Sequence, residues 1–156
     1  MGWTDSRIYT AFLTDVLNNT TAMDLNTDAS LSVALFGTTP TPDRTVASSS
    51  TAYGAGVWAS GGVFDASGWP AVGRDLASVT SQFSAGVYTF DAADTVSAND
   101  TTTFSAAFGC LVYDNTIATP VVDQGICFSY FGGTQSVSSG RFTVSWHGSG
   151  IFTLTV

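Results

Sequence analysis

The sequence has 156 residues, of which 44% are hydrophobic and 13% aromatic, a composition that excludes a disordered tail and suits one domain with one core. All twelve acidic residues are aspartate, the four basic residues are arginine, and the net charge is −8. Such a chain repels phosphate backbones, which argues against nucleic-acid binding. With no apolar run as long as a membrane span and no secretion signal, we expect a soluble protein that contacts no membrane.

The only predicted helix comes first, over residues 4–19. Thr4 or Asp5 can cap it, and Asn18-Asn19 ends it. Apolar side chains recur at helical spacing and form one stripe, made of Ile8, Phe12, Leu13, Val16 and Leu17. The stripe favours packing on a sheet of the same chain, with a partner surface as the alternative. Trp3 lies outside the helix, and we expect it to be the more exposed contact.

A short acidic stretch follows the helix. Asp24, Asn26 and Asp28 have the spacing that opens a calcium loop. The match then fails, because Ala29 replaces the glycine of the sharp turn and Leu35 replaces the closing glutamate. We therefore expect a polar helix-to-strand connection without a metal. Residues 31–36 alternate as a strand, which two prolines then end.

Residues 37–73 form a long, glycine-rich region that reads as a loop. Aromatic side chains in a long loop either dock onto the sheet below or project outward to a neighbour, and the sequence leaves both alternatives open. Together with Trp3, the aromatic residues of this loop are the candidate interface residues: Tyr53, Trp58, Phe64 and Trp69.

The rest of the chain is predicted to consist of short strands between turns. Residues 76–83 and 86–90 form a pair joined through Ser84-Ala85, and residues 95–97 form a short strand. The segment 103–156 holds two further strand pairs, over residues 104–113, 125–131, 141–147 and 151–156. We find no linker that divides residues 1–156. The pattern predicts a mainly β, single-domain β-sandwich, Greek-key or jelly-roll-like, with one short N-terminal helix.

The last two of these strands give the clearest hairpin pattern. With a three-residue loop over residues 148–150, apolar side chains face each other in the pairs Trp146–Phe152, Val144–Leu154 and Phe142–Val156. The loop length calls for a left-handed residue, which Gly150 tolerates.

The preceding strand pair has a similar expected register. A symmetric loop sets Leu111 opposite Ile126 and Cys110 beside Cys127. A disulfide between directly opposed strand partners is strained, so we expect two free thiols, with a disulfide as the alternative.

Residues for chemistry are sparse. His147 and Ser149 lie close in sequence, but Gly148-Ser149-Gly150 lacks the pattern of a nucleophile elbow. Asp91 and Asp94 are the closest acidic pair, and aspartate at this spacing is typical of turns. Two cysteines and one histidine form no close-spaced zinc motif. We predict that the protein is not an enzyme and has no catalytic residues, cofactor or metal.

Several segments resemble small virion proteins of tailed phages: residues 28–36, 90–96, 108–114 and 131–137, and above all Gly140-Arg141-Phe142-Thr143-Val144-Ser145-Trp146 followed by Gly150-Ile151. The similar proteins pair a short N-terminal helix with a β-rich body and occur as capsid decoration or minor structural proteins. The likeness departs in residues 37–73, where this chain has its own tryptophan-containing insertion. Its motifs are strand and turn patterns rather than catalytic signatures.

The resemblance implies a capsid decoration protein on the virion exterior, bound to the major capsid protein, and we expect it to form a trimer. A hydroxyl-rich surface with few charges suits such contacts. Two rivals remain open. One is a tail or fibre component that binds host glycans through exposed aromatic rings, and the other is a small hydrolase with His147 as its base.

Overall fold

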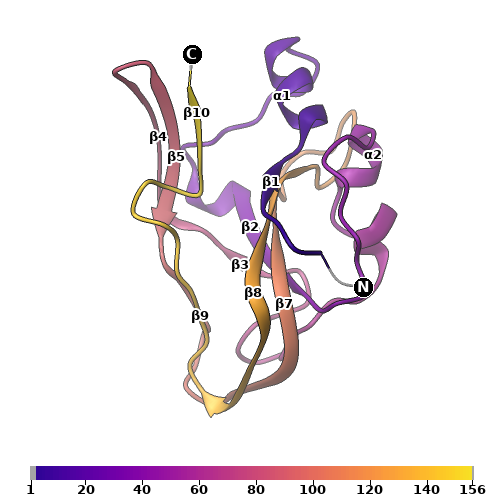
Figure 1. Cartoon of the computed structure of the whole chain (residues 1–156), viewed down its shortest axis with the longest axis vertical. Coiled ribbons are helices and arrows are strands. Elements are labelled where there is room, and N and C mark those ends of the chain that lie inside the picture. Colours follow the sequence, from indigo (N-terminus) through magenta and orange to yellow (C-terminus); the bar gives the residue numbers. More distant parts are fainter. Residues whose placement is uncertain (1–2, 156) are drawn as a thin grey trace.

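The computed structural model describes residues 3–155, in which antiparallel strands form three sheets (Figure 1). Its helical elements are the α-helices α1 (Thr10–Leu17) and α2 (Ser48–Thr51) and the 3-10 helices η1 (Asp28–Ser30) and η2 (Gly56–Ala59). Its strands are β1 (Arg7–Ile8), β2 (Leu31–Phe36), β3 (Arg74–Asp75), β4 (Ala77–Ser84), β5 (Val87–Ala93), β6 (Thr95–Val96), β7 (Thr102–Asp114), β8 (Gly125–Gly140), β9 (Thr143–Val144) and β10 (Phe152–Thr155).

The largest sheet has five strands in the order β1-β8-β7-β2-β3. All six residues of β2 are buried, which requires cover on both faces of the sheet. In the view of Figure 1, α2 and the three-stranded sheet β10-β5-β4 lie on opposite sides of β7 and β8. The mainly β, single-domain architecture expected from the sequence is confirmed.

Strands β7 and β8 pair as expected, but their register differs. Leu111 faces Phe128 in place of Ile126, a shift of two residues that leaves the buried faces unchanged. The irregularity between Val112 and Tyr113 contributes one residue of this shift, because Tyr113 pairs with Gly125 whereas Val112 pairs with Cys127.

The two cysteines are consequently not direct partners. Cys110 faces Ser129, and Cys127 faces Val112. Both cysteines are buried and free, which confirms the expectation of two thiols.

The expected hairpin of β4 and β5 is present, but its turn lies one residue later than the expected Ser84-Ala85. Ser84 pairs with Val87, so Ala85 and Gly86 form a two-residue turn. Both turn residues have positive φ, +49° and +81°, as a type I′ turn requires. The short strand expected at residues 95–97 is also present, as β6.

The expected hairpin between residues 141–147 and 151–156 is wrong. β9 pairs with β6, setting Val144 opposite Thr95, and β10 pairs with β5, setting Phe152 opposite Phe90. Gly150 does adopt the left-handed conformation, with φ of +99°. The glycine turn therefore forms as a corner that carries the chain from one sheet to another, without bringing its two flanking strands together. The expected partner Val156 lies outside the described residues.

The N-terminal helix is shorter than the predicted span of residues 4–19. It begins at Thr10, because Arg7 and Ile8 pair with β8 and the Thr10 amide donates to the carbonyl of Arg44. Of the expected apolar stripe only Phe12 is buried, while Leu17 is 83% exposed. Neither Thr4 nor Asp5 caps the helix, because both precede β1 and the N-cap position falls on Tyr9.

The long region 37–73 contains the helices α2 and η2, and it covers one face of the larger sheet. The ring of Trp58 lies edge-on to Phe36 of β2, with centroids 4.7 Å apart. Tyr53 stacks on Tyr113 of β7 at 5.0 Å. Of the two alternatives for this region, docking onto the sheet is the one that most of its aromatic residues adopt.

Candidate interaction groove

A groove of about 390 Å³ opens between the end of the larger sheet and β10. Its walls come from parts of the chain that are distant in sequence, namely β1, the start of α1, the segment before α2, β8 and β10. The lining residues are Ser6, Arg7, Ile8, Thr10, Leu13, Arg44, Cys127, Phe128, Ser129, Ile151, Phe152 and Leu154.

The floor of the groove is apolar because strand alternation turns one set of side chains toward it. Ile8 pairs with Cys127 across β1 and β8, so their side chains point to the same face of the sheet. Phe152 stands on the β10 side and packs against Phe12 of α1, with ring centroids 6.1 Å apart. Leu154 is only half-buried, so apolar surface remains open to solvent beside β10.

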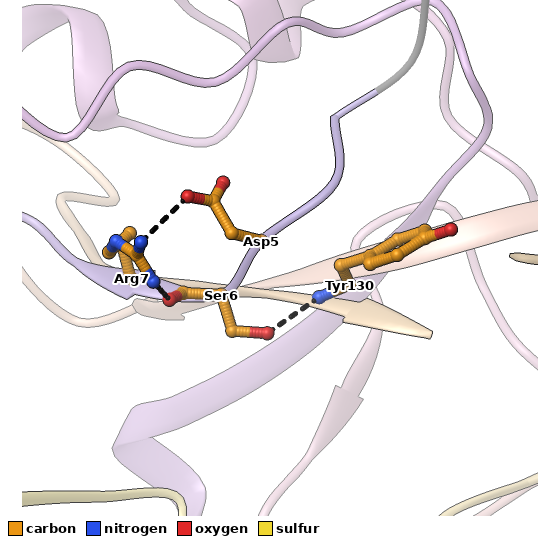
Figure 2. Close-up of polar contacts among 4 residues, drawn as sticks. All are labelled: Asp5, Ser6, Arg7 and Tyr130. Carbon is orange, nitrogen blue, oxygen red and sulfur yellow. Dashed lines mark hydrogen bonds and ion pairs between the residues drawn. The ribbon is translucent and has the colours of Figure 1, made fainter. Parts of the chain in front are cut away.

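The N-terminal segment that forms one wall is held by polar contacts (Figure 2). The Tyr130 amide donates to Ser6 Oγ at 3.0 Å, which prolongs the attachment of β1 to β8. The Arg7 guanidinium pairs with the Asp5 carboxylate at 2.9 Å and donates to the Ser6 carbonyl at 2.9 Å. These contacts fix Arg7 at the rim, although an ion pair this exposed adds little stability.

Arg44 forms the other charged part of the rim. Its carbonyl accepts from both the amide and the hydroxyl of Thr10, each at 3.0 Å, which ties residue 44 to the start of α1. Its side chain is exposed and has no ion-pair partner among residues 3–155. Two of the four arginines in a chain of net charge −8 therefore border a single groove.

Two sheets end at this groove. β1 pairs only with β8, and β10 pairs only with β5, so each strand has a free edge within the part of the chain that the structure describes. A free edge presents backbone N–H and C=O groups that can pair with another strand. The groove thus combines apolar surface, positive charge and backbone hydrogen-bonding groups.

The expected exposed contact at Trp3 is wrong, and the tryptophans of the long loop are buried too. Trp3, Trp58 and Trp69 have exposed fractions of 4%, 2% and 0%. The Trp58 indole donates to the Tyr9 hydroxyl at 2.7 Å, and the indoles of Trp3 and Trp69 donate to backbone carbonyls. A buried, hydrogen-bonded indole serves the core and leaves no surface for a partner.

The other two candidate interface residues differ. Tyr53 is half-buried in its stack on Tyr113, and burial raises the pKa of its hydroxyl. Phe64 is 53% exposed and is the only one of the five candidates that presents most of its ring surface to solvent.

Residues considered for chemistry make structural contacts. His147 is exposed, and its Nδ1 accepts from the Ser149 amide at 3.1 Å within the corner turn. The Asp94 carboxylate accepts from the Ser145 hydroxyl at 2.9 Å and the Trp146 amide at 3.0 Å, and so holds the same corner.

The aspartates of the calcium-like stretch also bind the chain itself. Asp28 accepts from the amides of Ser78 and Val79 at 2.8 and 2.7 Å, which secures the irregular part of β4. Asn26 accepts from the amide and hydroxyl of Ser81. Across residues 3–155, no three histidine, cysteine or acidic side chains cluster closely enough to hold a metal ion.

A second hollow of about 460 Å³ lies beside β8 and β9. The rings of Tyr130, Phe131 and Phe142 line it together with the amide of Gln135 and the hydroxyls of Thr143 and Ser145. All three rings are half-buried, so each leaves part of its surface open.

No protein-family model, curated protein or solved structure matches the chain. Within residues 3–155, no helix combines the length and the apolar content that crossing a membrane requires. What the protein does must therefore be inferred from its own residues.

Proposed function

We propose that the protein is a virion structural protein of a tailed phage, a capsid decoration protein bound to the outer surface of the major capsid protein shell. The observation that carries the proposal is the groove between β1 and β10, where apolar surface and two arginines lie beside two free strand edges. Free strand edges beside apolar surface are features by which proteins bind an extended polypeptide, and they support a polypeptide partner. The strand and turn patterns that resemble phage virion proteins support the capsid shell as that partner.

The use of polar side chains supports a structural role. Carboxylates of Asp28 and Asp94 accept backbone N–H groups, and Asp65 accepts three more from Ser67, Gly68 and Thr103. Carboxylates engaged in this way stabilise turns and strand ends, and are less free to act as general acids or bases. A protein that works by adhesion needs such a rigid scaffold to hold its binding surface in a fixed shape.

On the shell, the protein acts as a homotrimer in many symmetry-related copies. Symmetric repetition multiplies a modest contact, because each further contact within an assembly forms at high effective concentration. A groove of ordinary affinity is therefore sufficient for stable attachment. Sedimentation equilibrium tests the oligomer, and a species of single-chain mass at all concentrations contradicts the trimer.

The direct experiment mixes the purified protein with undecorated capsids and sediments them. We expect co-sedimentation that saturates at a fixed ratio of protein to capsid subunits. Phe64→Ser is a useful companion variant, because this exposed ring lies outside the groove lining and its removal should leave binding unchanged. Absence of co-sedimentation at saturating protein concentration overturns the proposal.

The hollow beside β8 and β9 supports a second candidate function, that of a tail or fibre component that binds host glycans. Aromatic faces stack on sugar rings, and the amide of Gln135 and the nearby hydroxyls can bind sugar hydroxyls. On a glycan array, this function predicts hits that Gln135→Ala removes and Gln82→Ala, a glutamine outside the hollow, retains. Binding unaffected by Gln135→Ala contradicts it.

A further inference from the structure

We propose that the groove receives an extended segment of a partner polypeptide, which adds as a strand to the free edge of β10 and places a carboxylate beside Arg7 and Arg44. Only the assignment of this segment to the capsid shell rests on the proposed function. The mode of binding follows from the groove.

The backbone of β10 provides the first part of the recognition. β10 pairs with β5 on one side, and within residues 3–155 no strand occupies its other side, where Ile151, Phe152 and Leu154 line the groove. Its four residues span about 13 Å, enough for several backbone hydrogen bonds to one incoming strand. Binding would extend the sheet β10-β5-β4 to four strands.

The apolar floor provides the second part. Side chains of a strand alternate between two faces, so every second residue of the segment would face the floor formed by Ile8, Cys127 and Phe152. The remaining side chains would face solvent. The segment should therefore alternate apolar and polar residues, and its apolar side chains would cover the open surface of Leu154.

Charge provides the third part of the recognition, because it determines the sign of the charge that the bound segment must carry. Arg7 already shares its guanidinium with Asp5 and the Ser6 carbonyl, whereas Arg44 has no ion-pair partner within the described chain. A carboxylate on the incoming strand can therefore pair with Arg44 at little cost. A lysine or arginine at the same place would be repelled, so the groove should bind acidic segments in preference to basic ones.

A second copy of this chain is a poorer occupant, even though it carries many aspartates. Each copy has a net charge of −8, so a second copy would enter the groove against repulsion between the two bodies. The proposed trimer would have to offset the same repulsion through contacts at another surface. A neutral or basic body that presents one acidic strand would satisfy both the local attraction and the overall charge.

The first test selects binders from a display library of random twelve-residue peptides. The bait is the whole chain, as wild type and as Arg44→Glu, Leu154→Asp and the matched control Arg141→Glu, an exposed arginine outside the groove. Circular dichroism first checks that each variant is folded. Wild type and Arg141→Glu should enrich peptides in which apolar residues alternate and an Asp or Glu recurs.

The charge reversal should weaken binding of an enriched synthetic peptide about tenfold or more at low salt, and Leu154→Asp should weaken it similarly. Arg141→Glu should change it less than about twofold. Equal binding by all four proteins overturns the proposal, and so does enrichment of lysine- or arginine-containing peptides.

Hydrogen exchange locates the strand. Amides of residues 152–155 should become protected when the peptide binds. Protection confined to another part of the chain overturns strand addition to β10. Protection that grows with protein concentration in the absence of peptide identifies a second copy as the occupant, which also overturns the proposal.

Capsid sedimentation with the same variants separates this proposal from the decoration function. Loss of capsid binding in Arg44→Glu but not in Arg141→Glu supports both. Equal capsid binding by all variants leaves decoration standing and overturns the groove as its site. Peptide binding without any capsid binding supports the groove and overturns decoration.

Discussion

Ala85 occupies a backbone conformation that suits it poorly. Its φ of +49° lies in the left-handed region, where a Cβ atom costs about 1 kcal/mol or more, and asparagine tolerates this region better. We predict that Ala85→Asn raises the free energy of unfolding by about 0.5–1 kcal/mol, measured by urea denaturation. Gly86→Ala, at a φ of +81°, should lower it. A lower stability for Ala85→Asn would show that the turn relaxes to another type.

The two buried thiols predict a loss of stability in alkali. Burial raises the pKa of Cys110 to about 12, and burial together with the neighbouring Cys110 raises that of Cys127. In the unfolded chain these thiols ionise near a pKa of about 8.5, so stability is fully present below that pH and falls as the pH rises above it.

Denaturation between about pH 8 and about pH 10 should show this fall, at up to about 1.4 kcal/mol per pH unit for each thiol. In Cys110→Ala/Cys127→Ala the slope should be flatter, whatever the loss of absolute stability from the cavities. Equal slopes in the two proteins would contradict the assigned cause.

The environment of Asp65 predicts a loss of folding stability in acid. The hydroxyl of Ser67, followed by the amides of Thr103, Gly68 and Ser67, holds the pKa of this carboxyl well below its usual range. Its contribution is present above the unfolded pKa of about 3.9 and is lost as the pH falls further. Asp65→Asn should therefore be less stable at neutral pH and lose less stability on acidification than wild type does. If the thermal stability of Asp65→Asn fell with decreasing pH as steeply as that of wild type, this prediction would be refuted.

At the scale of elements, the corner between β9 and β10 depends on one glycine. A Cβ atom on Gly150 would lie 2.7 Å from the Phe90 carbonyl, and the residue has a φ of +99°. Gly148, two residues earlier, has open space around its Cβ position and no positive φ.

We predict that Gly150→Ala lowers the free energy of unfolding by about 2 kcal/mol, whereas Gly148→Ala changes it by less than about 0.5 kcal/mol. Chemical denaturation of the two variants side by side measures the difference. Equal effects would show that the corner can relax without cost.

Elements that depend on neighbouring residues could be predicted from the sequence. The hairpin of β4 and β5 was predictable because its turn and both strands are local, and strand β2 because its alternation is clear. The partners of β9 and β10 were not, because the apolar pattern fits any strand with the same alternation and the true partners lie in residues 87–96. The helix start was missed because pairing with β8 overrode a good N-cap at Asp5.

The groove itself could not be predicted. Arg7 and Arg44 are far apart in sequence and share no motif, and only the fold brings them to one rim. The tryptophans could not be assigned to the core for a related reason. Tryptophan is enriched both in cores and at interfaces, and composition does not separate the two, so only the contacts of Trp58 and Trp69 place them inside.

At the scale of the whole molecule, charge and sheet edges act together. A net charge of −8 discourages pairing between copies through their strand edges, which protects a protein in which residues 3–155 leave one edge of β1 and one edge of β10 without a partner strand. The same edges remain available to a partner that neutralises the charge locally at Arg44. Attachment of this kind weakens as salt screens the arginine.

The tryptophans of residues 37–73 also make this region its own optical probe. Trp58 and Trp69 are shielded from water only while the region lies against the sheet, so its release would move their fluorescence emission toward longer wavelengths. Detachment of this layer could thus be followed separately from melting of the strands, which circular dichroism records, without attaching a dye to the chain.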